Sequence, residues 1–269
     1  MNRAEWSRFA TMYRLLIRSS FRSRMQYSFN FWVGIAASAM INAVEFALLA
    51  VVLNRFGTIQ GWSIAESGYL YAVLTLSKAL YRSFASDVHH LEKYLVSGDL
   101  DGLLLRPAPV LLILMAQNFS PRFGEMLLGV SMLTISLGAI FEGRPGLWTA
   151  IPLTAAAIAA GAVLMFGIGL LTASAGFWLT RIEALQVLTE DAARTAAQYP
   201  LTIYPGWLQG LLTGLIPVAF INYMPALYII RGTHGAWTLG LSVGVAAAML
   251  LLSLQMWKFG LSRYQSTGS

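Results

Sequence analysis

The chain has 269 residues, of which 57% are hydrophobic and only 11% are charged. Soluble domains carry about 25% charged residues, so the composition excludes an ordinary soluble protein and indicates a polytopic membrane protein. There is no cysteine, which excludes disulfides, thiolate metal sites and cysteine nucleophiles. The net charge of +6 does not indicate nucleic-acid binding, because the arginines flank hydrophobic segments as they do in membrane proteins.

The N-terminal segment, residues 1–27, is predicted to be an amphipathic helix that lies in the cytoplasmic membrane interface. Apolar residues such as Tyr13 and Ile17 recur at helical spacing between arginines such as Arg14 and Arg18. A cleaved signal peptide is not expected, because the charged region is too long and the apolar core starts too late.

Six hydrophobic stretches follow, and each is long enough to cross a hydrocarbon layer of about 30 Å as a helix. The predicted spans lie at about residues 29–53, 66–86, 109–141, 147–179, 206–230 and 236–257, within a transmembrane region 28–260. We therefore predict an all-α integral membrane protein. The second span contains Lys78 and Arg82, whose side chains are expected to snorkel toward the cytoplasmic face. The third is interrupted near Pro121, where Arg122 and Glu125 are expected to neutralise each other.

With an even number of spans, both termini lie on the same side of the membrane. The basic N-terminal arm, the loops at 87–107 and 180–205, and the tail at 261–269 then share one side. The short loops on the opposite side contain three basic residues, Arg55, Arg144 and Arg231. This asymmetry predicts that both termini are cytoplasmic.

The cytoplasmic loop at 87–107 is predicted to contain two short helices joined by a hinge. Asp87 and Asp99 can each cap a helix, and Gly98 tolerates the left-handed conformation of a helix end. The three leucines at 103–105 require an apolar surface. The loop therefore lies either in the lipid headgroup layer or against a cytoplasmic partner.

Residues 180–205 are predicted to form a second amphipathic interfacial helix. Ile182, Leu185 and Leu188 recur at helical spacing with charged residues between them. The helix is expected to end before Pro200.

Three stretches carry a resemblance to a known family. "YLVSGDLDGLLLRP" at 94–107 resembles a cytoplasmic signature of a subgroup of ABC type-2 exporter permeases, and residues 199–229 resemble that subgroup's second hallmark. The C-terminal "WKFGLSRYQSTGS" is similar to the subgroup's usual ending, except that Gln265 precedes the serine. The resemblance covers essentially the whole chain.

The resemblance implies a six-helix subunit of an ATP-driven exporter in a bacterial-type cytoplasmic membrane. It implies a second permease, identical or paralogous, and two cytoplasmic ABC ATPase subunits. The loop after the second span would be the coupling helix that fits a groove on the ATPase. Carried over by motif, the coupling residues are Glu92, Lys93, Tyr94, Ser97, Gly98, Asp99, Asp101 and Arg106.

The sequence agrees with a division of labour between this chain and a partner. It has no Walker A motif, G-x-x-x-x-G-K-[ST], so ATP and Mg²⁺ are expected in the partner and no cofactor in this chain. The adjacent His89 and His90 point about 100° apart on a helix and make a poor metal chelate. We expect neither a metal site nor catalytic residues, and the chain by itself is not expected to be an enzyme.

Two groups of residues are candidates for the translocation path. Asn42 and Glu45 share one face of the first span, where they line the path or the dimer interface, or Glu45 pairs with a basic residue of a neighbouring span. Pro217 and Pro225, with Asn222 between them, predict a kinked or re-entrant segment, which is either a gate or an ordinary packed kink.

A hydrophobic or amphipathic substrate is expected. The main alternative is a secondary transporter driven by an ion gradient. That class often has internal repeats, and none is evident in the sequence. A lipid-modifying enzyme would need converging polar residues at one interface, and an ion channel would need a filter-like segment. Neither feature stands out.

Overall fold

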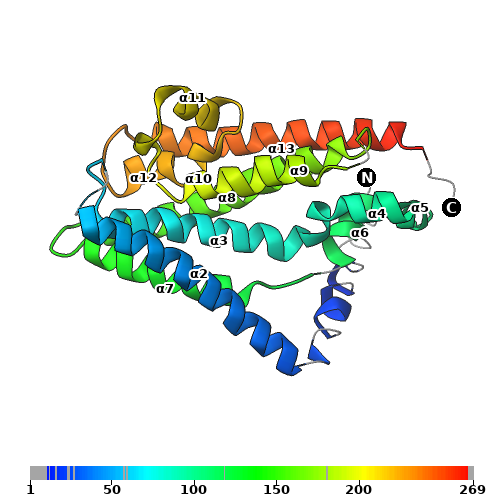
Figure 1. Ribbon diagram of the computed structural model, residues 1–269, viewed down its shortest axis with the longest axis horizontal. Coiled ribbons are helices and arrows are strands. Elements are labelled where there is room, and N and C mark those ends of the chain that lie inside the picture. Colours follow the sequence, from blue (N-terminus) through cyan, green and yellow to red (C-terminus); the bar gives the residue numbers. More distant parts are fainter. Residues whose placement is uncertain are drawn as a thin grey trace.

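The computed structural model describes residues 11, 13–15, 17–22, 25, 26, 28–56, 58, 60–117, 119–179 and 181–265. Over these residues the protein is a bundle of helices without a β-strand, which confirms the all-α prediction (Figure 1). The predicted N-terminal helix lies largely outside the described residues. Its described part is helical at 13–15 and 17–22, and the Ser20 hydroxyl donates to the Gln117 carbonyl at 2.6 Å. Residues 266–269 of the predicted tail also lie outside.

Five long helices run side by side along the bundle. They are α2 (Ser28–Phe56), α3 (Ile64–His89), α7 (Phe123–Ile140), α8 (Leu147–Ala175) and α13 (Trp237–Arg263). Three short helices lie at one end: α4 (Leu91–Ser97), α5 (Asp99–Leu104) and α6 (Val110–Gln117) (Figure 1). The start of α2 and the end of α13 lie at this same end, which we call the α4–α5 end.

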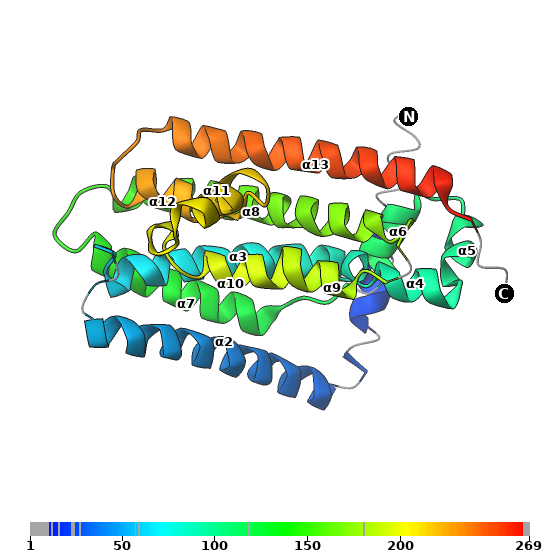
Figure 2. The ribbon, with the colours of Figure 1, turned by 45° about the horizontal axis from the view of Figure 1, so that its top comes forward.

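The remaining elements connect α8 to α13. The first three form one continuous helical segment: α9 (Glu183–Gln186), the π-helix η1 (Val187–Ala192) and α10 (Ala193–Ala197). The others lie toward the end opposite to α4 and α5: the 3₁₀ turn η2 (Leu201–Ile203), α11 (Gly206–Gly214), the 3₁₀ turn η3 (Val218–Phe220) and α12 (Tyr223–Ile229) (Figure 2).

Helix α3 forms the centre of the bundle and packs against α6, α7 and α8. It begins with a capping box, in which Ser63 and Glu66 each accept the other's backbone N–H. Residues 67–77 are all buried. Because this stretch faces protein on every side, serine and threonine are tolerated in it where they find hydrogen-bond partners. The hydroxyl of Ser77, for example, donates to the Ile158 carbonyl on α8 at 3.1 Å.

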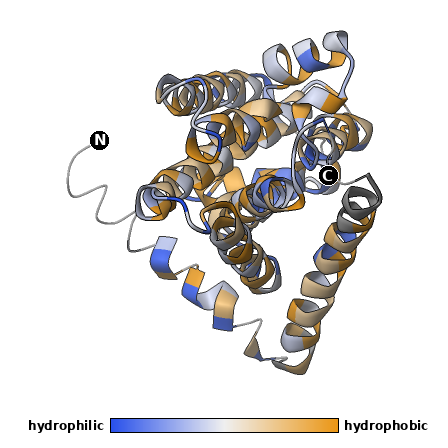
Figure 3. Cartoon of the chain, turned by 90° about the vertical axis from the view of Figure 1, so that its left-hand side faces the viewer, coloured by the Kyte–Doolittle hydropathy of each residue, from blue (hydrophilic) through white to orange (hydrophobic). Residues whose placement is uncertain are grey.

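Four of the long helices are apolar enough to cross a membrane. The candidate segments among the described residues are Phe31–Leu48 in α2, Phe123–Ile140, Leu147–Ala175 and Trp237–Arg263. Figure 3, which looks along the bundle, shows α2 at its edge, and Trp32, Met40 and Leu48 on this helix are more than 60% exposed. Such large exposed apolar side chains are expected where a helix faces lipid.

The predicted fifth span, 206–230, is not one continuous helix. The segments Gly206–Gly214 and Val218–Ile229 qualify as a membrane span only together, and they are bent by 72° relative to each other. The break falls at Pro217, which has no backbone N–H and disfavours helical geometry in the residue before it. The structure therefore has four candidate spans, or five with this bent pair, among the described residues.

The prediction of an interfacial helix at residues 180–205 is wrong in its location. The segment is helical and ends before Pro200, but it runs antiparallel to α3 within the bundle (Figure 2). Its start lies beside Glu92, just beyond the end of α3, where the backbone N–H of Ile182 donates to the Glu92 carboxylate at 2.8 Å. Its other end lies near the start of α3, because Asn222 donates to the carbonyls of both Ala197 and Leu70.

Candidate functional site

The loop predicted to contact a partner consists of α4 and α5, joined at Gly98. Gly98 has φ of +75° and ψ of 0°, the left-handed conformation that glycine adopts without a steric penalty. Asp87 and Asp99 do not occupy the helix N-cap positions that were predicted for them. Asp99 is the first residue of α5 and Gly98 is its N-cap, without a side-chain cap bond. The carboxylate of Asp87 accepts the hydroxyl of Tyr94 at 2.6 Å, which fixes α4 to the end of α3.

The leucines of this loop divide into buried and exposed groups. Leu100 and Leu103 face the bundle, with 0% and 4% of their surface exposed, and they fix α5 in place. Leu105 and Val96 point outward, with 88% and 64% exposed. Exposed apolar side chains of this size are typical of a surface that contacts lipid or another protein.

The predicted coupling residues also divide by exposure. Lys93, Ser97, Asp99 and Arg106 are exposed, whereas Tyr94 is buried and Glu92, Gly98 and Asp101 are intermediate. The Ser97 hydroxyl donates to the Asp99 carboxylate at 2.7 Å, which orders the hinge. Burial and the neighbouring Asp101 carboxylate raise the pKa of Tyr264, the residue after α13. The chain's last described turn therefore lies against α5.

Glu92 has a structural role that the motif did not reveal. Its carboxylate accepts the backbone N–H groups of Ile182 and Glu183 at 2.8 and 3.0 Å, at the start of α9. A carboxylate at this position satisfies free backbone donors and interacts favourably with the helix dipole. The Gln186 side chain also donates to the His89 carbonyl. These bonds connect α4 directly to the segment that runs back along α3.

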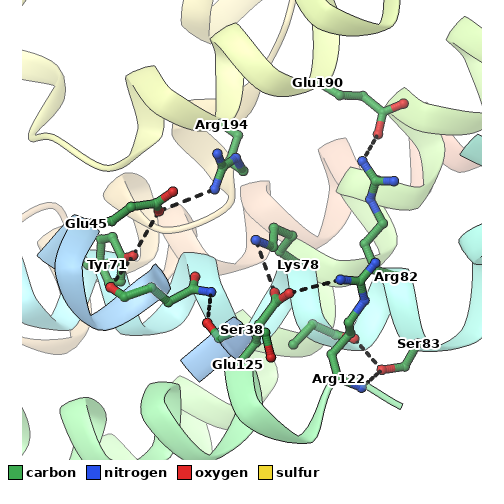
Figure 4. Close-up of polar contacts among 12 residues, drawn as sticks. Ser38, Glu45, Tyr71, Lys78, Arg82, Ser83, Arg122, Glu125, Glu190 and Arg194 are labelled. Carbon is green, nitrogen blue, oxygen red and sulfur yellow. Dashed lines mark hydrogen bonds and ion pairs between the residues drawn. The ribbon is translucent and has the colours of Figure 1, made fainter. Parts of the chain in front are cut away.

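A group of ion pairs lies deeper in the bundle (Figure 4). We call it the charged cluster, and it consists of Glu45, Lys78, Arg82, Arg122, Glu125, Glu190 and Arg194. Lys78 and Arg122 both approach the Glu125 carboxylate, at 3.1 and 3.3 Å. The predicted pair of Arg122 and Glu125 is therefore confirmed. Lys78 and Arg82 were expected to snorkel toward the cytoplasmic face, and the structure pairs them with the buried carboxylates of Glu125 and Glu190.

Glu190 connects the cluster to the α4–α5 end. Its side chain is 6% exposed. Its carboxylate lies 3.4 Å from the Arg82 guanidinium, 3.3 Å from the Tyr81 hydroxyl and 2.9 Å from Nδ1 of His89. It lies in the π-helix η1, a conformation that occurs frequently at functional sites. Among the described residues, no group of three or more His, Asp or Glu side chains is arranged to hold a metal ion.

Asn42 and Glu45 both face the bundle from α2. The Tyr71 hydroxyl reaches the backbone carbonyl of Asn42 at 3.0 Å and the Glu45 carboxylate at 3.1 Å. Glu45 also pairs with Arg194 at 3.6 Å and accepts from Gln198 at 3.3 Å. Of the two expectations for Glu45, pairing with a basic residue is therefore observed. Its partner, Arg194, comes from the segment that had been predicted as an interfacial helix.

The residues of the broken segment fix it to its neighbours. Asn222 is 1% exposed, and its amide donates to the carbonyls of Ala197 at 2.7 Å and Leu70 at 3.0 Å. Pro217 precedes the turn η3, and Pro225 is buried in the first turn of α12. Asn222 thus holds the break against both α10 and α3. Hydropathy alone gives no sign of this polar anchor.

A cavity of about 220 Å³ opens into the charged cluster. It is lined by Lys78, Arg82, Arg122, Glu125, Met165, Glu190, Asp191 and Arg194. These residues come from α3, the start of α7, α8 and the η1–α10 segment. The lining can bind a charged group through ion pairs and hydrogen bonds, but no nucleophile is paired with a base in it.

A family model described as "ABC-2 family transporter protein" matches residues 39–268. The matched region contains α4 and α5, the charged cluster and the broken segment. No curated protein and no solved structure gave a significant match.

Proposed function

The chain belongs to the ABC-2 transporter family, and we propose that it is the permease subunit of an ATP-driven exporter. It is a multi-pass membrane protein, and membership of the family implies association with an ABC ATPase. The absence of a Walker A motif supports hydrolysis in that partner, which would bind ATP and Mg²⁺. The complex would contain two ATPase subunits and a second permease, identical or paralogous, and move a hydrophobic or amphipathic substrate by alternating access.

We propose six membrane crossings, by α2, α3, α7, α8, the α9–α10 segment and α13. The antiparallel course of α9–α10 along α3 supports counting it as a crossing. The α4–α5 end would be cytoplasmic, together with both termini. Lys93, Arg106 and Lys258 belong to that end, in agreement with the positive-inside rule. The bent pair α11–α12 would lie on the outer side.

The observation that carries the proposal is the form of the α4–α5 loop within a chain of this family. The loop is fixed from behind by buried leucines and presents Val96, Asp99, Leu105 and Arg106 outward. Movement of an ATPase bound to this face would reach α9 through Glu92, and the charged cluster through His89 and Glu190.

The test is co-purification from gently solubilised membranes. We would compare wild type with Asp99→Arg and with a matched control, Glu142→Arg, which also replaces a carboxylate by a guanidinium, at an exposed position in the loop at the opposite end. A P-loop ATPase that is retained by wild type and control and lost by Asp99→Arg would support the proposal. Equal retention in all three would contradict docking at α4–α5. No ATPase in any sample would contradict ATP-driven transport.

The alternative is an ion-driven secondary transporter. Buried carboxylates such as Glu125 and Glu190 are the residue type that such transporters use to bind coupling ions. In proteoliposomes that contain the permease alone, this alternative requires uptake or release of substrate driven by a pH or sodium gradient. The exporter proposal requires none without the ATPase.

A further inference from the structure

We propose that the cavity in the charged cluster binds the anionic headgroup of an amphipathic substrate, such as a phosphate or carboxylate. The inference deepens the proposed function. It rests on that proposal only for the statement that the bound molecule is a substrate. The binding step itself depends only on this chain. It follows from which groups in the cluster already have partners and which have unused hydrogen-bonding capacity.

The carboxylates of the cluster are occupied by protein. Glu125 is approached by Lys78 and Arg122, and Glu190 by Tyr81, Arg82 and His89. Glu45 accepts from Tyr71 and Gln198 and pairs with Arg194. Each carboxylate therefore has at least one cationic partner, although the Oε2 atom of Glu125, 3.1 Å from the Lys78 ammonium, is buried without a hydrogen-bond partner.

The arginines are not occupied to the same degree. A guanidinium has five N–H donors. Arg82 and Arg122 each donate one hydrogen bond to a carboxylate, at 3.4 and 3.3 Å, and Arg194 approaches Glu45 only to 3.6 Å. The Nε atom of Arg122 is buried without a hydrogen-bond partner. Strong guanidinium–oxyanion bonds are about 2.7–2.9 Å long. An incoming oxyanion therefore meets guanidinium N–H donors with unused hydrogen-bonding capacity on α3, at the start of α7 and on α10.

Charge alone does not select the ligand. The cavity is lined by four cations and three carboxylates, and Glu45 pairs with Arg194 from outside the lining. Asp191 is the lining carboxylate that forms no ion pair with any described residue, and it is exposed. Asp191 and the Oε2 atom of Glu125, which lies 3.1 Å from the Lys78 ammonium, are outnumbered by the unused donors of Arg82, Arg122 and Arg194. An anion is favoured because of these donors.

A second cavity explains why the ligand would be amphipathic. It measures about 190 Å³ and lies between the first half of α2 and the start of α7. Arg122 lines both cavities, and Phe31, Ile35 and Phe123 contribute apolar walls to the second. A headgroup held by Arg122 in the first cavity would place an apolar chain against these walls. The pair of cavities thus matches a molecule with one charged and one apolar end.

The test measures binding of radiolabelled dodecyl phosphate to the full-length permease in phosphatidylcholine nanodiscs, with empty nanodiscs subtracted. Arg122→Gln and Arg194→Gln should each weaken binding roughly tenfold, the effect of one lost charge-assisted contact. Arg144→Gln, an exposed change in the loop at the opposite end, should leave binding unchanged. Arg122→Lys keeps the charge and the fold, and should lose less affinity than Arg122→Gln.

Two results would overturn the inference. One is equal binding by wild type and both Gln variants. The other is that dodecyltrimethylammonium displaces the probe as effectively as unlabelled dodecyl phosphate does. That result would indicate a site that binds cations.

Nanodiscs that contain phosphatidylglycerol distinguish a transported amphiphile from a structural lipid. If this lipid displaces the probe and dodecyl phosphate does not raise ATP hydrolysis by the complex, the assignment as a substrate site is wrong. Stimulated hydrolysis that is lost in Arg122→Gln supports it. Binding is measured on the permease alone, so failure to find an ATPase would refute the proposed function without affecting this result.

Discussion

Replacement of Glu190 by glutamine should destabilise the bundle, because it removes the charge that holds Arg82 in the protein interior. The Glu190 side chain is 6% exposed and that of Arg82 is 15% exposed. The variant keeps the size of the side chain, and its amide oxygen can still accept from Tyr81. The change therefore isolates the effect of charge.

The magnitude follows from the burial of the pair. Loss of one partner from a fully buried ion pair costs about 3–5 kcal/mol, since the other charge remains buried. Arg82 is partly exposed and lines a cavity that is wide enough for water, so we expect roughly half of this cost, about 2 kcal/mol. Removal of both charges should cost much less, because no uncompensated charge remains.

The assay is reversible unfolding in mixed micelles with increasing SDS, followed by circular dichroism. It compares wild type, Glu190→Gln, Glu190→Leu, and Glu190→Leu combined with Arg82→Met. We expect the double variant to regain most of the stability that Glu190→Leu loses. The reasoning is refuted if Glu190→Gln lies within about 0.5 kcal/mol of wild type, the range of ordinary surface changes. It is also refuted if the double variant is as unstable as Glu190→Leu.

Three further changes test other contacts. Glu92→Ala removes the cap of α9 and should lower the free energy of unfolding by about 1 kcal/mol in the same assay. A loss of stability no larger than that of Glu142→Ala would contradict the capping role. Gly124→Ala should lower the free energy of unfolding by about 1–3 kcal/mol, because a Cβ there collides with the Ile35 carbonyl. At the control position, Gly138→Ala, the added Cβ meets no atom and the change should be neutral. Equal effects would contradict the close approach of α2 and α7. Asn222→Ala removes two buried hydrogen bonds and should speed proteolysis of the 199–229 segment; unchanged cleavage would contradict its anchoring role.

The parts of the fold that face lipid could be predicted from sequence. Helices α2, α8 and α13 each contain a long apolar stretch, so hydropathy locates them. The 180–205 segment was misplaced because hydropathy assumes a lipid environment. Glu190 and Arg194 on one face of this segment find partners inside the protein, while Val187 and Leu188 are 52% and 60% exposed, so the polar residues do not need an aqueous surface.

The candidate site was only partly predictable, for a similar reason. The hinge at Gly98 follows from a local requirement, the left-handed end of a helix, which a short sequence can reveal. The partners of Lys78 and Glu45 are distant in sequence and depend on how helices pack. Their identity therefore needs the three-dimensional structure. The same holds for Glu92, whose motif position gives no sign that it caps α9.

Site-directed crosslinking at the α4–α5 loop tests the central claim most directly. The chain has no cysteine, so a single introduced cysteine is the one site in this chain that a thiol-linked photocrosslinker can label. The first variant is Leu105→Cys, on the proposed docking face, where the native leucine is 88% exposed. The control is Trp148→Cys, at the opposite end, where the native tryptophan is 84% exposed. We predict that irradiation of native membranes joins the ATPase to the probe at position 105 and not at position 148. An ATPase crosslinked from position 148, or from neither position, would contradict the account.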